Sequence, residues 1–430
     1  MEHRSRTDAH VDRYAARAQG MVASEIRALF AVASRPEVVS LAGGMPYVSA
    51  LPLDLVGDMV GDLLTRRGAE MLQYASAQGD PLLRERICEV MALEGIRAAA
   101  DDVVVTVGAQ QALDLLTRIF VDPGDVVLAE APSYVGALGT FAAYQANVVH
   151  VPLDDYGLIP EALRETLERL RRERRRVKFL YTVPTFQNPA GVTLTAPRRR
   201  EVLEICAAYD VLVIEDNPYG LLGFDGPPMR ALRADDADRV IYLGSFSKTI
   251  ASGLRVGWAL APHGVRAKLV LAAESAMLSH SNICQLAVRE YLSTQPWQAQ
   301  IKSFQELYRE RRDAMLDSLA ALMPPGCTWT RPRGGFFVWL TLPTGLDAKA
   351  MAPRAIAGRV AYVPGTGFYG DGSGHERLRL SYCYPEPARV REGVRRLASV
   401  VEQEIELRDT FGTGHAPAHG GVDTPGPDLS

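Results

Sequence analysis

The chain has 430 residues, of which 47% are hydrophobic and 23% are charged, a balance typical of globular proteins with a sizeable core. At roughly 150 residues per domain, this length predicts two or three domains. The formal net charge of -4 argues against nucleic acid or an anionic membrane as the main partner, and we expect neither. No run of about 18 apolar residues occurs, so the sequence predicts no transmembrane helix.

The five cysteines are scattered, odd in number and never arranged as C-x-x-C. This pattern predicts neither a disulfide framework nor a zinc site, and it fits a reducing compartment. The first twenty residues are polar and lack the apolar core of a signal peptide. We therefore expect a cytoplasmic protein without a metal site.

From residue 103 onwards, short β-branched runs alternate with longer helical patterns. Near-continuous apolar strands separated by helices indicate a mainly parallel sheet that is covered on both faces. We therefore predict an α/β fold with a doubly wound, mainly parallel, seven-stranded sheet. The predicted strands are 103–107, 125–130, 148–153, 177–183, 211–216, 240–244 and 255–261.

The pattern changes after residue 310, where a smaller α+β domain is predicted. An apolar helical stripe runs through 387–407, and a tail rich in Gly and Pro follows that we expect to be disordered. The predicted strands of this domain are 336–342, 360–365 and 377–382.

Polar clusters follow several predicted strands of the large sheet, at the edge where open α/β sheets bind ligands. Each has an ordinary explanation when taken singly: Asn188 as turn chemistry, Asp216 as a helix cap, Lys248 as a loop lysine. Four such clusters at one edge are better explained by a site. They are Gly108-Ala109-Gln110, the loop with Asn188, the segment Glu215–Tyr219, and Ser245-Phe246-Ser247-Lys248.

The chemistry that these residues jointly suit is that of pyridoxal phosphate. This cofactor needs a lysine for its Schiff base and a carboxylate that keeps its pyridine nitrogen protonated, which Lys248 and Asp216 can supply. Asn188 and Tyr219 can donate hydrogen bonds to its phenolate oxygen. Its phosphate needs hydroxyls, a guanidinium and a helix N-terminus, which are offered by Gly108, Ala109, Gln110, Ser245, Ser247 and Arg255.

With these residues in place, the chain resembles fold-type I pyridoxal-phosphate enzymes of the class I/II aminotransferase group. It is most similar to the 2-aminoadipate-aminotransferase-like branch, which also supplies the C-terminal half of MocR-type transcription regulators. The matching stretches lie in family order over about residues 20–405 and include VVSLAGGMP, LQYASAQGDPLLRE, TVGAQQALDLL, EAPSYVGAL, VPTFQNPAGVTLT, VIEDNPYG, GSFSKTIASGLRVGW, RGGFFVWL and RLRLSY.

The resemblance implies roles at matched positions. Lys248 would be the Schiff-base lysine and proton-transferring base, Asp216 the partner of the pyridine nitrogen, and Tyr134 the aromatic residue stacked on the ring. It also implies the phenolate donors Asn188 and Tyr219 and the phosphate ligands named above.

For substrate and partner, the resemblance implies that Arg379 binds the α-carboxylate, with Asn188 and the backbone of Gly44 nearby. Arg377 and Arg379 alternate onto one strand face, so the residues alone cannot choose between them, and the resemblance favours Arg379. Tyr74 would reach the phosphate across a dimer interface, which implies a homodimer with shared sites.

We divide the chain into an N-terminal arm with a substrate-capping segment (1–50), a large cofactor-binding domain (51–310), a small domain (311–407) and the tail (408–430). The sequence departs from the family pattern in two places. The usual A-P-G before the phosphate arginine is Ala251-Ser252-Gly253 here. The stretch YVSALPLD is longer than usual where the substrate side chain is read, so specificity stays open.

The resulting function is transfer of an amino group between an L-amino acid and a 2-oxo acid by a ping-pong mechanism. Glutamate, 2-aminoadipate and hydrophobic or aromatic amino acids are the expected substrates, and Arg27 is a candidate partner for a distal carboxylate. A MocR-type sensor would need a DNA-binding domain, and only about 40 residues precede the LAGG motif. Decarboxylation, elimination or condensation on the same scaffold is the alternative, since a fold does not fix the reaction.

Overall fold

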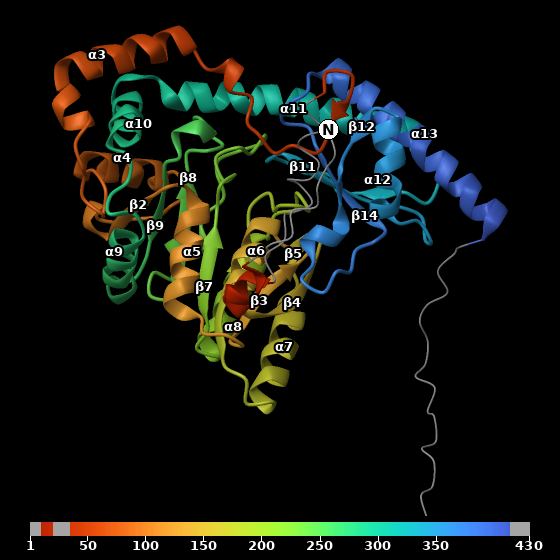
Figure 1. The fold of residues 1–430 in the computed structure, drawn as a ribbon, viewed down its shortest axis with the longest axis horizontal. Coiled ribbons are helices and arrows are strands. Elements are labelled where there is room, and N and C mark those ends of the chain that lie inside the picture. The colour runs from red at the N-terminus through yellow and green to blue at the C-terminus, as the bar shows by residue number, and fades with distance from the viewer. Residues whose placement is uncertain (1–9, 20–34, 413–430) are drawn as a thin grey trace, which may run out of the picture.

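The computed structural model describes residues 10–19 and 35–412, and it contains two sheets of three or more strands (Figure 1). The larger sheet has the strand order β2-β9-β8-β7-β6-β3-β4-β5. Its strands are β2 (Val103–Thr106), β3 (Val126–Ala131), β4 (Asn147–Asp154), β5 (Gly157–Leu158), β6 (Val177–Thr182), β7 (Leu212–Asp216), β8 (Val240–Ser245) and β9 (Gly257–Leu260).

The mainly parallel sheet expected from the sequence is confirmed. The neighbours from β8 through β7, β6 and β3 to β4 are parallel, while β9 runs antiparallel to both β2 and β8. All seven predicted strands are present, and an eighth, β5, pairs antiparallel with the end of β4. With two residues, β5 is too short to give a sequence signal.

Helices cover both faces of this sheet because successive strand residues point to opposite sides. Val127 and Ile214 pack with α5, α6 and α9, whereas their neighbours Leu128 and Val213 pack with α7 and α8. Helices α4 and α10 cover the β2 end of the second face. The helices of this part are α3 (Leu53–Met71), α4 (Pro81–Ala92), α5 (Ala109–Phe120), α6 (Val135–Ala143), α7 (Pro160–Arg172), α8 (Ala196–Ala208), α9 (His263–Met277) and α10 (Asn282–Thr294), and a short α1 (Ala16–Gln19) precedes them.

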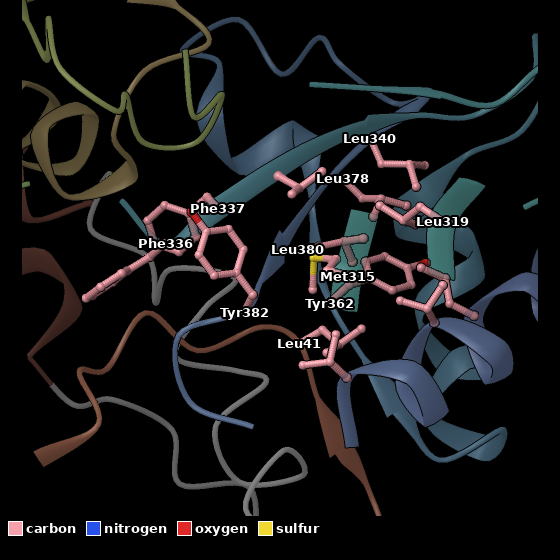
Figure 2. Packing of buried hydrophobic residues seen from close by; sticks show 14 of the residues in the cluster. Leu41, Met315, Leu319, Phe336, Phe337, Leu340, Tyr362, Leu378, Leu380 and Tyr382 are labelled. Carbon is pink, nitrogen blue, oxygen red and sulfur yellow. The ribbon is translucent and has the colours of Figure 1, made fainter. Parts of the chain in front are cut away.

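The smaller sheet is antiparallel, with the order β10-β11-β14-β13. Its hydrophobic core joins the sheet to the helices beside it and continues through Phe336, Phe337 and Tyr382 (Figure 2). The elements are β10 (Thr328–Trp329), β11 (Phe337–Thr341), β13 (Val363–Pro364), β14 (Arg377–Ser381), α11 (Trp297–Leu322), α12 (Ala348–Ala357) and α13 (Pro387–Phe411).

Three details of this region differ from the sequence-based expectation. The predicted strand 360–365 is divided: β12 (Val360–Ala361) pairs in parallel with β1 (Val39–Ser40), and β13 pairs with β14. Helix α11 runs continuously through the boundary drawn at residue 310. Helix α13 extends four residues beyond 407, to Phe411. The rest of the predicted tail, 413–430, lies outside the described residues.

The predicted apolar stripe on the last helix is confirmed, since Val390, Val394, Leu397 and Val401 are fully buried. Gly393 lies on the same helix, and a Cβ atom there would come within 2.7 Å of Val39 Cγ1. The N-terminal strand β1 therefore packs directly on α13. Across the described residues, no helix is both long and apolar enough to cross a membrane.

We predict that Gly393→Ala lowers the free energy of unfolding by about 1–3 kcal/mol, because the added methyl group overpacks the contact with β1. Gly264→Ala, in α9 and with no atom within 4 Å of the new Cβ, serves as the control. Urea unfolding followed by circular dichroism measures both. Equal stability of the two variants would show that β1 does not pack on α13.

Candidate active site

A cavity of about 270 Å³ lies between the carboxyl ends of the large-sheet strands and the small sheet. Of the site residues predicted from the sequence that the structure describes, all but Gly108 and Tyr74 line it. The lining residues are Gly44, Met45, Ala109, Gln110, Tyr134, Val183, Asn188, Asp216, Pro218, Tyr219, Ser245, Ser247, Lys248, Ser252, Arg255, Phe337 and Arg379.

One end of the cavity gathers hydrogen-bond donors around the N-terminus of α5. Gly108 is the N-cap residue, with φ of 82°, and a Cβ atom there would lie 2.7 Å from Arg255 Nη2. The Arg255 guanidinium donates to the Val107 carbonyl at 2.9 Å and to Ser247 Oγ at 3.3 Å. Ser245 Oγ accepts from the backbone N–H of Ser247. Free helix N–H groups, hydroxyls and a guanidinium in one place suit a phosphate dianion.

Asp216 ends strand β7 with one carboxylate oxygen satisfied and the other not. Its Oδ2 accepts a hydrogen bond of 2.7 Å from the Tyr181 hydroxyl, whereas Oδ1 is buried and has no partner among the described residues. Burial raises the pKa of Asp216 to about 6, against the hydrogen bond from Tyr181, which lowers it. A buried acceptor without a donor is costly, so the site fits a ligand that brings an N–H group, as a protonated pyridine does.

Lys248 also lines the cavity. Its Nζ donates to the Gly44 carbonyl at 2.8 Å and lies 5.7 Å from the centroid of the Phe336 ring. Burial, assisted by the positive charges of Arg379 and Arg255 and opposed by Cys383, lowers the pKa of Lys248 to about 8. A larger fraction of this amine is neutral near pH 7 than of an ordinary lysine, which suits a nucleophile.

Arg379 lies at the small-sheet side of the cavity and is 2% exposed. Its Nη1 donates to Asn188 Oδ1 at 2.9 Å and its Nη2 to the Ala42 carbonyl at 2.8 Å, while Nε is buried and unsatisfied. The guanidinium stacks 4.1 Å above the Phe337 ring. Burial lowers the pKa of Arg379 to about 10. Its partners among the described residues are all neutral, so a carboxylate ligand would complete its pairing.

The sequence alone did not show whether Arg377 or Arg379 faces the site, and the surroundings of the two side chains now distinguish them. Arg377 is only partly buried and pairs with Glu376 at 3.1 Å, whereas Arg379 lines the cavity. Strand β14 pairs Arg377 with the end of β11 and Arg379 with Trp339, deeper in the sheet.

Aromatic side chains form much of the remaining wall. Tyr219 is buried, with its ring edge-on to Phe336 and Phe337 at centroid distances of 5.4 and 6.0 Å. Burial raises the pKa of Tyr219, so its phenol stays protonated and can donate a hydrogen bond. Tyr134 immediately precedes α6, and burial likewise raises its pKa. Tyr134 lines the same cavity.

Tyr74 is the predicted residue that the structure places away from the cavity. It follows α3 and its side chain is 75% exposed. Other large apolar residues are exposed on or next to the same helix and α10: Leu53, Leu55, Leu64 and Leu72 on or after α3, and Leu278 and Ile283 before or in α10. A contact of Tyr74 with a phosphate would require a second subunit. Arg27 lies outside the described residues.

Five residues that line the cavity were not predicted from the sequence, and four of them are apolar. Met45 and Phe337 line the cavity beside Gly44, where a Cβ atom would come within 2.8 Å of Phe337 Cζ. Val183, Pro218 and Ser252 complete the lining. All five stand in or next to the quoted motifs, so their sequence neighbours were the available signal.

The geometry agrees with comparisons to known proteins. Residues 58–397 match the sequence model of a family described as "Aminotransferase class I and II". The chain is 42% identical to aromatic-amino-acid aminotransferase 1 of Thermococcus litoralis (91% of this chain, 95% of the relative) and 37% identical to 2-aminoadipate transaminase of Thermus thermophilus (90% and 95%). A crystal structure of Pyrococcus horikoshii kynurenine aminotransferase in complex with PMP superposes with a TM-score of 0.88 at 39% identity, covering 92% of this chain and 99% of that one.

We predict that Asp216→Asn stabilises the cofactor-free protein by about 2 kcal/mol at pH 7.5, because the folded protein then no longer holds a buried charge. The folded pKa of about 6 lies above the ordinary 3.8, so Asp216 favours folding at low pH and this contribution is lost as the pH rises through 6. The difference should therefore shrink between pH 7.5 and pH 4.5.

Urea unfolding at several pH values measures this difference, with Asp58→Asn on the exposed face of α3 as the control. A stability difference that does not change with pH, or a destabilised Asp216→Asn variant, would contradict the assignment of a raised pKa to Asp216.

Proposed function

Because this chain belongs to the class I and II aminotransferase family, it is a pyridoxal-phosphate-dependent aminotransferase, and we propose that its preferred amino donors are aromatic and large hydrophobic L-amino acids. When bound, pyridoxal phosphate supplies an electron sink for the substrate's α-carbon. The amino group moves in two half-reactions, in which the first 2-oxo acid leaves before the second 2-oxo acid binds. We propose glutamate and 2-oxoglutarate as the second pair.

The observation that carries this substrate proposal is the distribution of charge in the cavity. Its charged lining residues are Asp216, Lys248, Arg255 and Arg379. The first three suit the cofactor and the fourth an α-carboxylate, so no charged side chain of the described lining is left for a side-chain carboxylate. Met45 and Phe337 offer apolar surface instead, which favours an apolar substrate side chain.

The relatives support two candidate substrate classes. The Thermococcus litoralis relative is named for aromatic amino acids, and the Pyrococcus horikoshii structure contains kynurenine. The Thermus thermophilus relative is named for 2-aminoadipate. For this chain, 2-aminoadipate is the second candidate, and it would need a cation from outside the described lining, such as Arg27.

We assign the chemical roles to this chain's residues as follows. Lys248 takes and returns the proton at the substrate's α-carbon, for which its partly neutral amine is suited. Arg379, oriented by Asn188, binds the α-carboxylate. Asp216, whose Oδ1 is buried without a partner among the described residues, would accept the hydrogen bond of the cofactor's pyridine nitrogen. The donors around α5, with Ser245, Ser247 and Arg255, hold the phosphate.

The ring of the cofactor would be held between further residues of the same cavity. Tyr134 would stack on it, and Tyr219 would donate to its phenolate oxygen. Asn188 accepts from Arg379 through Oδ1, which leaves its Nδ2 to donate to the phenolate oxygen as well. One amide thus links the cofactor end of the cavity to the carboxylate end.

We also propose a homodimer, a two-domain organisation and a cytoplasmic location. The exposed apolar residues around α3 and Tyr74 suit an interface between subunits. Residues 51–310 would form the cofactor-binding domain and 311–407 the small domain, with α11 crossing between them and β1 joining the second. All five cysteines are free, as expected in a reducing compartment.

We predict that kcat/KM for phenylalanine exceeds kcat/KM for 2-aminoadipate by about tenfold or more, because an apolar subsite leaves a carboxylate desolvated and unpaired. Steady-state rates with 2-oxoglutarate as the common acceptor measure both. A higher kcat/KM for 2-aminoadipate would contradict the proposal and favour the second candidate.

We predict that Lys248→Ala and Tyr74→Ala complement each other in mixed dimers. Lys248→Ala should retain cofactor through its phosphate contacts but lose turnover by several orders of magnitude. Tyr74→Ala should lose cofactor affinity. In a mixed dimer, one of the two sites combines an intact Lys248 with the intact Tyr74 of the Lys248→Ala subunit.

Unfolding and refolding the two variants together forms the mixed dimers, with each variant treated alone as the control. Activity should then rise well above that of either variant. No recovery, although dimers form, would place Tyr74 outside the neighbouring site.

A further inference from the structure

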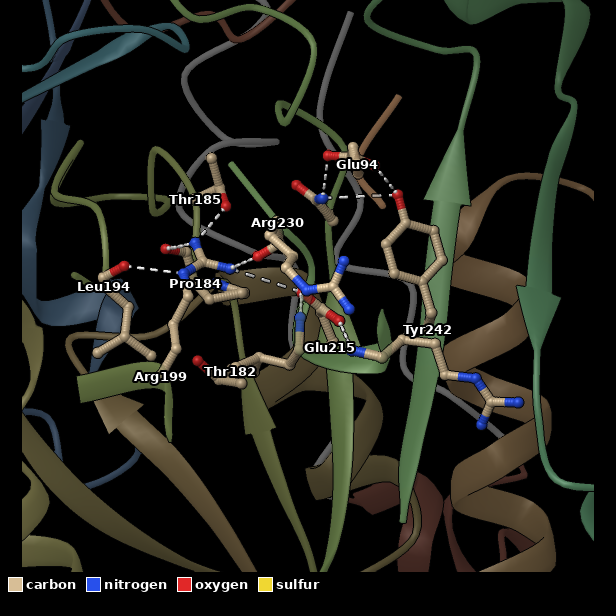
Figure 3. Close-up of polar contacts among 12 residues, drawn as sticks. Glu94, Thr182, Pro184, Thr185, Leu194, Arg199, Glu215, Arg230 and Tyr242 are labelled. Carbon is tan, nitrogen blue, oxygen red and sulfur yellow. Dashed lines mark hydrogen bonds and ion pairs between the residues drawn. The ribbon is translucent and has the colours of Figure 1, made fainter. Parts of the chain in front are cut away.

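Behind the wall of the cavity lies a buried carboxyl group that the proposed reaction does not use. Glu94 follows the C-terminal end of α4 and is 3% exposed. Its Oε1 accepts a hydrogen bond of 2.6 Å from Asn217 Nδ2, and its Oε2 accepts one of 2.5 Å from the Tyr242 hydroxyl (Figure 3). Its hydrogen-bond donors within the described part of the chain are thus both neutral.

This carboxyl group packs against the turn 216–220, which carries the cofactor-facing residues Asp216 and Tyr219. Asn217 immediately follows Asp216, and Tyr219 is two residues further on. A Cβ atom at Gly220 would overlap Glu94 Oε1, so the turn fits closely around the carboxyl group. The backbone N–H of Asn217 also donates to the Leu243 carbonyl of β8 at 2.9 Å.

The two donors to Glu94 come from different elements. Asn217 belongs to the turn after β7, and Tyr242 belongs to β8, whose end leads into Lys248. A buried carboxyl group without a cation is costly to keep. The carboxyl group of Glu94, however, links the end of α4 to the end of β7 and to β8, close to Asp216.

We propose that Glu94 is a positioning residue: it fixes the turn 216–220 through Asn217 and Tyr242, and so aims Asp216 and Tyr219 into the cavity. The proposal rests on the proposed cofactor site. Glu94 does not line the cavity, so its effect must pass through the turn. Small displacements of a site residue weaken binding and catalysis strongly, which is why such supporting contacts matter.

A second buried acid nearby, Glu215, has different hydrogen-bond partners from Glu94. Its carboxylate accepts from the backbone N–H groups of Leu232 and Arg233, both at 2.9 Å, and lies 3.9 Å from Arg199 (Figure 3). Glu215 therefore holds the 232–233 segment. Of these two buried acids, only Glu94 accepts a hydrogen bond from the side chain of Asn217, the residue after Asp216.

Two substitutions distinguish the effect of the hydrogen bonds of Glu94 from the effect of its negative charge. In Glu94→Gln, the amide oxygen can accept from Asn217 while the amide NH₂ donates to the Tyr242 hydroxyl oxygen, so both links survive. Glu94→Ala removes both. We predict that Glu94→Ala raises the Kd for pyridoxal phosphate about tenfold or more, within the range seen when supporting residues of a site are removed, whereas Glu94→Gln stays within about threefold of wild type.

Titration of the cofactor-free full-length protein with pyridoxal phosphate, followed by tryptophan fluorescence and visible absorbance, gives the Kd without relying on turnover. Wild-type affinity in Glu94→Ala would overturn the proposal. So would an equal loss in Glu94→Gln and Glu94→Ala, because the charge and not the positioning would then be responsible. Failure of the wild-type protein to bind the cofactor would instead overturn the proposed function.

A second pair of variants keeps the test decisive if Glu94→Ala does not fold. Tyr242→Phe removes the bond to Glu94 and a longer one of 3.5 Å from Asn217, whereas Tyr362→Phe removes a buried bond of 2.7 Å to the Ala348 carbonyl, in the small domain. Both should lower the Tm similarly, but only Tyr242→Phe should raise the Kd for pyridoxal phosphate, by several-fold. Equal Kd values for the two variants would contradict the positioning role.

Discussion

Besides Arg255, three charged side chains line one cavity, and each of the three is held by neutral groups. Asp216 accepts from a tyrosine hydroxyl, Lys248 donates to a backbone carbonyl, and Arg379 donates to an amide and a carbonyl. Buried charges without partners are costly. The site therefore fits a ligand that supplies a partner for each of these three charges. A ring N–H, a carbonyl carbon that an amine can attack and a carboxylate are the complementary groups, and a pyridoxal-phosphate aminotransferase brings all of them together.

Different parts of the fold supply these groups, and the cavity depends on how they meet. The large sheet carries Asp216 and Lys248, the small sheet carries Arg379, and the N-terminal segment contributes Gly44. Buried polar contacts fix the loops between them. Arg199, for example, donates to the Pro184 carbonyl and to Thr185 Oγ1 in the loop that leads to Asn188 (Figure 3).

The sequence predicts what depends on neighbouring residues, and it misses what depends on distant ones. The seven large-sheet strands and the polar clusters after them are local signals, and the structure brings those clusters to one cavity. The pairing of β1 with β12 joins residues more than 300 positions apart, which no local pattern encodes. The predicted strand 360–365 is divided at Tyr362 into β12 and β13, but its residues form one continuous apolar run, so the sequence gives no sign of the division. Met45, Phe337 and Glu94 act through tertiary contacts, so composition and spacing could not single them out.

Visible absorbance of the purified protein, loaded with pyridoxal phosphate, tests the central claim most directly. An L-amino acid is added first, and a 2-oxo acid follows after the free amino acid has been removed. If this cavity carries out both half-reactions, the cofactor's visible band falls with the amino acid and returns with the 2-oxo acid. A band that does not respond, or one that is lost and does not return, would contradict aminotransfer at this site.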